Sequence, residues 1–367
     1  MKTTSTSCPP SQLPPAGLSA EQVPQFVTIG FDDNAHSGLA TNTLEGVAWA
    51  SKVFSDITNP DGTRGSCSFY LTTKYITEEH AEEPTELLVK VLKEVLAQGH
   101  EVGNHTHNHY WGADFNLEQW LEEITTAQEF LTTQIGSDTS RDPQNIGFRT
   151  PFLGYNNATF EAIAKLNFLY DCSIEEGTQE DCDGTNFYWP YTLDEGSPAN
   201  KETCTHDSEL PIVEDHRGLW ELPAHVVIAP DDQHCEYYGI KPGFRSRLDS
   251  YKYTTDPDNE FDMSDGKITG LDYNCLVMFG MNKAEFLGTL KHTLDLRLAG
   301  NRAPFSFGGH SDVYATGYDI CPNITIAERR EAIEEFLAYA NSKPAVVITS
   351  GANIIRWMQE PRAQILS

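Results

Sequence analysis

The sequence predicts an α/β protein whose parallel strands form a sheet or barrel, and three observations support this prediction. Short apolar runs of strand length alternate with longer segments of helical periodicity along most of the 367 residues. Several of these runs are continuously apolar, which is typical of parallel strands buried on both faces. Polar, metal-competent side chains follow several of the strands, where parallel α/β folds place their sites.

Apolar runs of this kind are expected to form the strands. The first, QFVTIGF, is apolar almost throughout and ends in polar residues. The expected strands are 25–31, 67–73, 100–104, 145–151, 168–174, 218–228, 304–310 and 345–350.

Longer segments with apolar residues three and four positions apart are expected to form helices. In the first, Gly99 is the expected C-terminal cap, and the apolar stripe consists of Leu87, Leu88, Val91, Leu92, Val95 and Leu96. The expected helices are 83–99, 116–136, 157–167, 282–300 and 325–342.

The remaining segments define the domain organisation. Residues 1–24 are a Pro-rich lead-in, and residues 25–360 are expected to form a single domain. The polar stretches near 175–218 and 229–274 are expected to be long irregular loops inserted into that domain.

Composition limits the partners of the chain. A net charge of -29 makes nucleic acid an unexpected partner, and we interpret the acidic surface as a contribution to solubility. No run of 18 apolar residues occurs, so no membrane-spanning segment is expected. The N-terminal stretch lacks the apolar core of a signal peptide.

The cysteines indicate an oxidising compartment. Their even number and dispersed spacing, without a C-x-x-C pair, favour disulfides over a zinc ribbon. The loop-rich stretch between Cys182 and Cys204 makes these two the first candidate pair. We therefore expect a secreted or periplasmic protein. The eight cysteines are Cys8, Cys67, Cys172, Cys182, Cys204, Cys235, Cys275 and Cys321.

A histidine cluster is the most informative motif. The stretch GHEVGNHTHNHYW, residues 99–111, contains His105, His107 and His109. On a helix, His105 and His109 would share a face, because residues four apart are neighbours. On a strand, all three would share a face, because side chains alternate. Spacing alone leaves both alternatives open.

Other polar groups follow other strands. Asp32 and Asp33 come after the first expected strand, Arg149 lies near the end of the fourth, and His310 is at the end of a late one. Each group alone is more typical of a turn, a structural arginine or a core histidine. Because the carboxyl ends of parallel strands face one side, we expect these groups to converge with the histidine cluster.

These motifs resemble those of the polysaccharide deacetylases, the carbohydrate esterases of family 4 with NodB homology. GFDDN is similar to their T-F-D-D motif, and His105, Thr106 and His109 match H-[ST]-x-x-H. FRTPF is similar to their R-x-P-[YF] motif, and His310 matches a late histidine. FLYDCS, YWPYTLD and GLWELP resemble segments of arthropod-type chitin deacetylases, whereas the C-terminal part looks more bacterial. The likeness spans about residues 20 to 358, and it implies a distorted (β/α)7-type barrel with long irregular loops.

The resemblance implies a metal site. It makes Asp33, His105 and His109 the ligands and leaves His107 outside, as on the helical alternative. Two imidazoles and one carboxylate suit Zn²⁺ and leave positions open for water and substrate. Co²⁺ or Ni²⁺ could occupy the same set.

The resemblance also implies catalytic roles. Asp32 is the expected general base and His310 the general acid, while Arg149 orients Asp32. The backbone N–H of Phe152 is expected to complete the oxyanion hole, and Asp171 is the candidate second partner of Arg149. The expected sugar-stacking residues, with core packing as the alternative, are Trp220, Tyr191 and Trp189.

One motif departs from the family pattern. Gly308 and Gly309 stand where apolar residues usually precede the late histidine. They either enlarge the acetyl pocket or let another chain segment fill it.

The expected function is metal-dependent removal of N-acetyl groups from β-1,4-linked N-acetylglucosamine polymers or oligomers, with chitin as the first candidate and a monomer as the expected state. Peptidoglycan deacetylase or acetylxylan esterase activity would use the same mechanism. A catalytically silent carbohydrate-binding protein is the alternative from another class, and it predicts the loss of a ligand, base or acid. A metal-free amidohydrolase of the same fold predicts erosion of the histidine pair. Both histidines are present.

Overall fold

The computed structural model describes residues 7–41, 43–77, 83–137, 146–198, 213–252 and 262–364. Nine strands form the main sheet, in the order β12-β1-β2-β3-β4-β5-β8-β7, with β13 pairing with β1. These strands are β1 Gln25–Asp32, β2 Ser68–Leu71, β3 Glu101–Asn104, β4 Gly147–Phe148, β5 Tyr170–Asp171, β7 Tyr191–Thr192, β8 Trp220–Glu221, β12 Phe305–His310 and β13 Val346–Ile348.

Every pairing in this sheet is parallel except that of β7 with β8. Two short strand pairs accompany it: β6 Glu175–Glu176 with β9 Ala224–His225, and β10 Val227–Ile228 with β11 Lys267–Ile268. The chain around Gly270 lies between β9 and β12, where Gly308 donates its N–H to the Gly270 carbonyl at 2.7 Å. The sheet therefore curls into the predicted distorted barrel, which an irregular segment completes.

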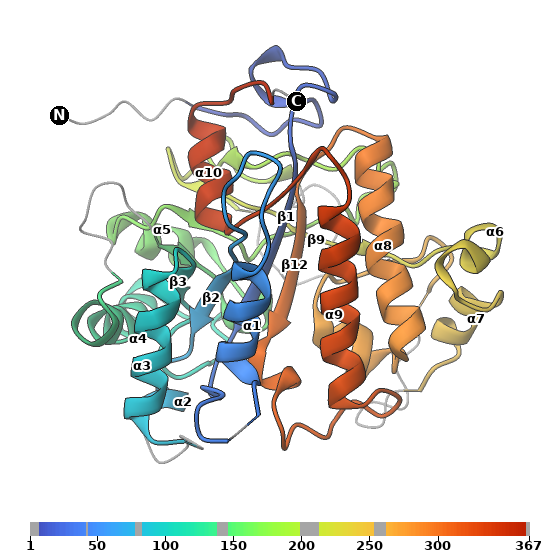
Figure 1. The fold of residues 1–367 in the computed structure, drawn as a ribbon. Coiled ribbons are helices and arrows are strands. Elements are labelled where there is room, and N and C mark those ends of the chain that lie inside the picture. The colour runs from blue at the N-terminus through green and yellow to red at the C-terminus, as the bar shows by residue number, and fades with distance from the viewer. Residues whose placement is uncertain are drawn as a thin grey trace.

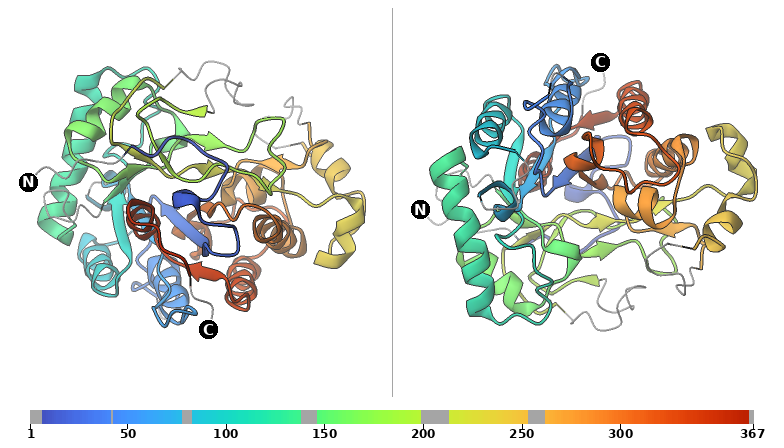
Figure 2. Two further views of the ribbon diagram at one scale, coloured as in Figure 1. Left: turned by 90° about the horizontal axis from the view of Figure 1, so that it is seen from above. Right: turned by 90° about the horizontal axis from the view of Figure 1, so that it is seen from below.

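Helices cover the outside of the sheet (Figure 1). The views from above and below show them arranged around the central strands (Figure 2). They are α1 Gly46–Ser55, α2 Lys74–Thr77, α3 Thr85–Ala97, α4 Leu117–Phe130, α5 Asn157–Lys165, α6 Asp232–Cys235, α7 Phe244–Asp249, α8 Lys283–Ala299, α9 Ile326–Asn341 and α10 Gly351–Gln359. No helix of the described ranges is both long and apolar enough to traverse a bilayer.

Local sequence signals explain where several helices begin. Helices α4, α5, α8 and α9 each start with a capping box, in which the N-cap side chain and the third helical residue exchange hydrogen bonds. Helix α4 runs into a π-helical turn, Leu131–Ile135, and the left-handed Gly136 ends it.

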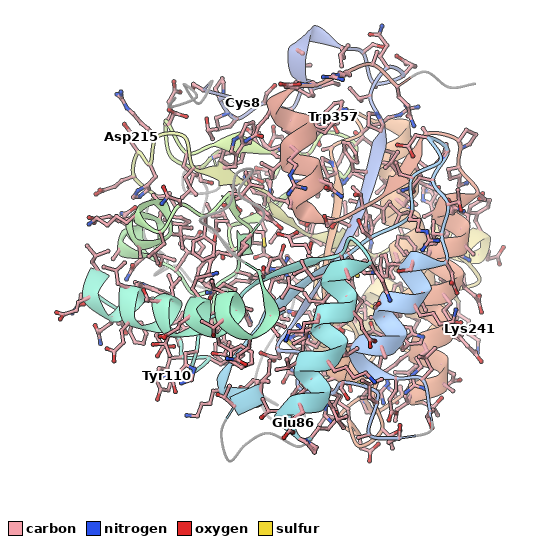
Figure 3. All side chains as sticks on the ribbon, turned by 60° about the vertical axis from the view of Figure 1, so that its left-hand side comes forward. Cys8, Glu86, Tyr110, Asp215, Lys241 and Trp357 are labelled. Atoms are coloured by element: carbon pink, nitrogen blue, oxygen red, sulfur yellow. The ribbon has the colours of Figure 1, made fainter. Side chains whose placement is uncertain are left out.

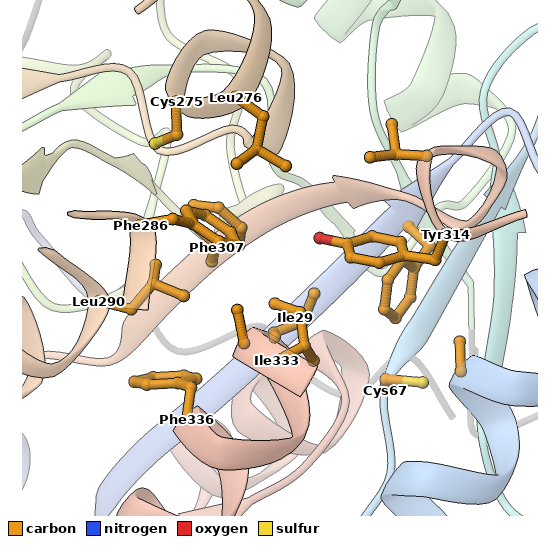
Figure 4. Close-up of a cluster of buried hydrophobic side chains, with 14 of the residues drawn as sticks. Ile29, Cys67, Cys275, Leu276, Phe286, Leu290, Phe307, Tyr314, Ile333 and Phe336 are labelled. Carbon is orange, nitrogen blue, oxygen red and sulfur yellow. The ribbon is translucent and has the colours of Figure 1, made fainter. Parts of the chain in front are cut away.

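The largest core cluster lies between the central strands and their helices. Figure 4 shows Ile29 of β1 and Phe307 of β12 among Phe286 and Leu290 of α8, with Phe336 of α9 beside them. Their burial explains why β1 and β12 are apolar almost throughout. This packing fixes the carboxyl ends of the two strands relative to each other.

The five predicted helices are all present. The first strand, Gln25–Asp32, is one residue longer than predicted, whereas the other predicted strands are shorter or divided. For example, residues 168–174 contain only the two-residue strand Tyr170–Asp171. The helices α1 and α10 were not predicted. The two stretches expected to be irregular contain short elements, including β6, β7, α6, α7 and β11.

The expected disulfides are not found in the described part of the chain. Seven cysteines are described there and all are free thiols, six of them buried and Cys8 half-buried. Cys67, for example, belongs to the largest core cluster, and its Sγ lies 3.4 Å from Nδ1 of His100. The candidate pair included Cys204, which lies outside the described residues.

Candidate metal centre

The carboxyl ends of β1, β3 and β12 bring the predicted groups together. Asp32 of β1 lies directly opposite His310 in the parallel register with β12. Asp33 follows β1, and His105 follows β3, two strands away in the sheet. In Figure 1 these strand ends lie at the lower edge, away from α10.

Asp33, His105 and His109 form the one group of metal-competent side chains found among the described residues. One ligand atom from each lies within 4.8 Å of the other two. The carboxylate Oδ1 of Asp33 is 3.3 Å from Nε2 of His109 and 3.9 Å from Nε2 of His105. These separations place all three ligands around one point.

The histidine cluster is neither helix nor strand. His105–His109 is a loop in which Thr106 and His109 have positive φ angles, and this turn brings the rings of His105 and His109 to 5.1 Å. His107 lies away from the centre, with Nδ1 at 2.9 Å from the Thr73 hydroxyl. Both alternatives considered for this motif were therefore wrong about its conformation.

A carboxylate from α4 holds this loop in place. Glu123 accepts the backbone N–H groups of His107 and Asn108 at 3.2 and 2.8 Å, and the Asn108 side chain at 2.7 Å. The loop is thus anchored to a regular helix, which suits a site that needs fixed geometry.

The environment of the two histidines favours unprotonated ligand nitrogens, whereas it disfavours the charge of Asp33. Nδ1 of His105 is 2.8 Å from the Arg149 carbonyl oxygen, which can only accept, so Nδ1 carries the proton and Nε2 keeps its lone pair. Burial lowers the pKa of His105 well below its usual value and that of His109 to about 4. Burial raises the pKa of Asp33 to about 6.

The donor set fits a divalent transition metal. Two neutral imidazoles and a carboxylate are the ligand types that Zn²⁺ and Co²⁺ accept. A cation among them would stabilise the ionised form of Asp33, whose burial otherwise disfavours its charge.

Asp32 is paired with Arg149 beneath this centre. Nη1 of Arg149 donates to Oδ1 of Asp32 at 2.9 Å, and its Nε donates to the Cys172 carbonyl at 3.2 Å. The guanidinium also lies over the Tyr70 ring, 4.7 Å from its centroid. Burial raises the pKa of Asp32, and the charge of Arg149 opposes this shift.

His310 is held by Asp272, a residue that the sequence analysis missed. Nδ1 of His310 is 2.7 Å from Oδ1 of Asp272, and the backbone N–H of His310 donates to Oδ2 at 2.9 Å. Burial alone would lower the pKa of His310, but the carboxylate of Asp272, with contributions from Asp33 and Asp32, raises it to about 10. Asp272 precedes His310 by 38 positions, so no local spacing marks it.

Asp171 was expected to pair with Arg149, but its hydrogen bonds lie elsewhere. It accepts the backbone N–H and the hydroxyl of Ser173, both at 2.8 Å. The Ser173 hydroxyl in turn accepts the N–H of Thr150 at 2.8 Å. Burial raises the pKa of Asp171 to about 6. Its contacts therefore brace the chain that follows Arg149, and Asp32 is the carboxylate that pairs with the guanidinium.

The aromatic residues expected to stack on sugar are buried. Trp220, Tyr191 and Trp189 are 4%, 0% and 1% exposed, so core packing is the correct interpretation of all three. The Tyr191 hydroxyl donates to Glu176 at 2.7 Å, and the Trp189 indole N–H donates to the Asn301 carbonyl. The polar atoms of Tyr191 and Trp189 are thus satisfied inside the protein.

Phe152 lies beside the triad, and its ring is exposed. Its ring centroid is 4.7 Å from that of His109. The positive φ of 58° sets its backbone in a tight turn after Pro151. Within the described residues its backbone N–H has no hydrogen-bond acceptor.

The space above the two glycines of β12 is filled by another segment. A Cβ at Gly308 would lie 2.1 Å from Cδ2 of Leu271, and one at Gly309 would lie 3.3 Å from a carboxylate oxygen of Asp272. Of the two alternatives for these glycines, filling by another chain segment is correct.

A cavity of about 370 Å³ includes His100, Glu101 and Arg356 in its lining, beside the start of α10. Glu101 already accepts hydrogen bonds from Ser68, Tyr170, and the N–H groups of Gly147 and Ala352. A carboxylate so fully bonded has a structural role, and the strand ends opposite remain the candidate site.

Comparisons with known proteins find likeness to polysaccharide deacetylases. Residues 65–170 match the polysaccharide deacetylase family. Chitin deacetylase 8 of Bombyx mori is 24% identical over 356 residues, which cover 95% of this chain and 74% of that protein. Chitin deacetylase 1 of Bombyx mori is 22% identical over 366 residues, which cover 95% of this chain and 53% of that protein.

A solved structure shares the fold. A protein from Mycobacterium smegmatis, provisionally assigned as a polysaccharide deacetylase, superposes with a TM-score of 0.51 at 17% identity. The superposition covers 96% of this chain and 98% of that one.

Proposed function

The chain is a relative of the polysaccharide deacetylases, and on this premise we propose that it removes N-acetyl groups from β-1,4-linked N-acetylglucosamine chains such as chitin. The observation that carries the proposal is the triad of Asp33, His105 and His109 beside two oriented pairs, Asp32–Arg149 and His310–Asp272. The likeness to two chitin deacetylases supports the choice of substrate.

We propose Zn²⁺ as the ion held by the triad, with Co²⁺ able to take its place. Such an ion would polarise the acetyl carbonyl and lower the pKa of a water molecule. The protein supplies the rest of the chemistry through its own side chains.

Each group has one task in this proposal. Asp32, oriented by Arg149, takes the proton of the attacking water. The free N–H of Phe152 stabilises the negative charge that develops on the carbonyl oxygen. His310, kept protonated by Asp272, gives its proton to the departing amine.

We further propose that the protein acts outside the cytoplasm, because an insoluble polymer such as chitin lies there. The free cysteines of the described part mean that this proposal rests on the substrate and not on disulfides. Fractionation of producing cells tests it, and recovery of the protein only in the cytosol would contradict it.

Acetate release from chitin oligomers and from acetylated xylan, before and after chelation and with zinc restored, tests the function. We expect chelation-sensitive release from the chitin oligomers. Release only from xylan would keep the mechanism and replace the substrate. No release from chitin, xylan or peptidoglycan by a preparation shown to hold zinc would favour a silent carbohydrate-binding protein.

The histidine loop supplies a matched control for the metal site. His105→Ala and His109→Ala should each abolish zinc retention and acetate release. His107→Ala, in the same loop but bonded to Thr73, should keep both. An equal loss of zinc retention and acetate release in all three variants would mean that both depend on the conformation of the loop and not on His105 and His109 as metal ligands.

A further inference from the structure

We infer that Trp111 and Phe152 form an aromatic platform that binds the sugar ring next to the one being deacetylated. This inference rests on the proposed function and adds to it a second sugar position. The platform lies in the loops after β3 and β4, beside the metal centre.

The exposure of these rings is the first observation. Among the described residues seven large hydrophobic side chains are exposed, and three of them follow the metal loop or lie against it: Tyr110, Trp111 and Phe152, at 49%, 42% and 62%. Isolated exposed side chains are ordinary, but a group of aromatic rings beside a site marks a binding surface.

A chain of ring contacts leads outward from the centre. The His109 and Phe152 centroids are 4.7 Å apart, and the Phe152 and Trp111 centroids are 6.4 Å apart. Trp111 therefore lies one ring further from the metal ligands than Phe152. Successive sugars of one polymer could lie along the same line.

The platform is held in place by the backbone beneath it. A Cβ at Gly154 would lie 2.7 Å from Cε3 of the Trp111 indole, so the indole in its present position lies close against this glycine and leaves no room for a Cβ. Phe152 and Leu153 both have positive φ angles, which set the turn that presents the Phe152 ring. Such backbone conformations in non-glycine residues persist where the surrounding structure enforces them.

The chemistry of the surface identifies its occupant. The C–H-bearing face of a pyranose ring packs on an aromatic ring, while its hydroxyl groups remain in water. The acetamide of a polymer must reach the triad, so the neighbouring ring of the same chain has to lie over adjoining surface. A second copy of the protein is the competing occupant.

Tryptophan fluorescence gives a direct test, because Trp111 is the one exposed tryptophan of six. Trp49, Trp120, Trp189 and Trp220 are buried, and Trp357 is partly buried. Figure 3 shows Trp357 at the end of the molecule opposite Tyr110, the neighbour of Trp111. Quenching of fluorescence by acrylamide therefore reports mainly on Trp111.

The binding experiment uses zinc-loaded protein and chitin pentamer, in the wild type and in a His310→Ala background that slows its consumption. We expect the pentamer to reduce acrylamide quenching severalfold. This protection should be absent in Trp111→Phe and kept in Trp357→Phe. Unchanged quenching at pentamer concentrations that support acetate release would overturn the inference. Protection without any acetate release would instead contradict only the proposed function.

Kinetics give a second readout. Trp111→Ala should raise KM for the pentamer about 5- to 10-fold and change kcat less than about 2-fold. Gly154→Ala should raise KM in the same way, because its Cβ would displace the indole. Trp111→Phe should raise KM less than Trp111→Ala does, because an aromatic ring remains. Tyr237→Ala removes an aromatic ring that is 75% exposed beside α6 and should have no effect. Unchanged KM in Trp111→Ala, or dissociation of a dimer in that variant, would contradict the platform.

Discussion

At the scale of single residues, the structure gives the two proposed acid–base groups different partners. Asp32 and His310 are opposite each other in neighbouring strands, yet one pairs with a guanidinium and the other with a carboxylate. Arg149 favours the ionised form of Asp32, and Asp272 favours the protonated form of His310. This difference suits the opposite proton transfers that we propose for the two groups.

Asp272→Asn tests this assignment. His310 must be protonated to act as an acid, and its pKa of about 10 keeps it so through neutral pH. Without the carboxylate, burial would dominate and the pKa would fall to about 6.5 or below. The alkaline limb of the kcat/KM profile should therefore move to lower pH, with a loss of about tenfold or more near pH ~8.

The control is Asp265→Asn, an exposed carboxylate in the same insertion that pairs with Lys267 at 3.4 Å. Its pH profile should match the wild type. An unshifted alkaline limb in Asp272→Asn would show that another group sets it.

Zinc affinity should depend on pH through Asp33. Its pKa of about 6 means that it becomes protonated as the pH falls through that value, whereas His109, at about 4, stays neutral. Above about pH 6 no proton competes with the metal. Below it the affinity should fall about tenfold per pH unit, because one proton is released for each ion bound.

Competition with a chromophoric chelator between pH ~5 and ~8 measures this slope. A hundredfold fall in zinc affinity per pH unit, or a fall in affinity that begins above pH ~7, would mean that an imidazole also releases a proton on binding. His107→Ala should leave the curve unchanged, because His107 lies outside the triad.

At the scale of elements, β12 and the segment around Gly270 depend on each other. The chain at 269–271 completes the barrel beside β12, and Leu271 occupies the space that a side chain at 308 would need. The same segment delivers Asp272 to His310. The two glycines before His310 are thus required by close approach and not by unusual backbone angles.

Gly308→Ala should destabilise the protein, because its Cβ would meet Leu271 at 2.1 Å and Arg149 at 3.3 Å. We expect a loss of about 1–3 kcal/mol in the free energy of unfolding, measured by urea denaturation. Leu271→Ala in the same chain should recover most of it. Additive losses in the double variant would show that these two side chains do not compete for one space.

The same elements show what could be predicted from sequence. Helical periodicity located α3, α4, α5, α8 and α9, and the polar groups after the strands included the whole triad. The loop at 105–109 escaped prediction because its shape depends on Glu123, a side chain from another element. Asp272, and the burial of Trp189, Tyr191 and Trp220, are set by tertiary packing, on which local spacing carries no information.

At the scale of the whole molecule, the lead-in and the C-terminal part pack on the same body. The backbone N–H of Trp189 donates to the Ser11 carbonyl at 2.9 Å, and the backbone N–H of Gln364 donates to the Gln22 carbonyl at 2.7 Å. β13 also pairs with β1. We propose that residues 25–360 act as one catalytic domain and expect a single cooperative unfolding transition. Two separate transitions would contradict this.

The cysteines allow a prediction about the chain as a whole. The sequence has eight, and the seven described are free, six of them in the interior. Because burial shields a thiol and raises its pKa, as for Cys67 and Cys275, Ellman's reagent should react with very few in the native protein. In denaturant without reductant, at least seven should react. Six or fewer reactive thiols, in protein kept from oxidation during purification, would reveal a disulfide. That result would restore the interpretation that these cysteines form disulfides.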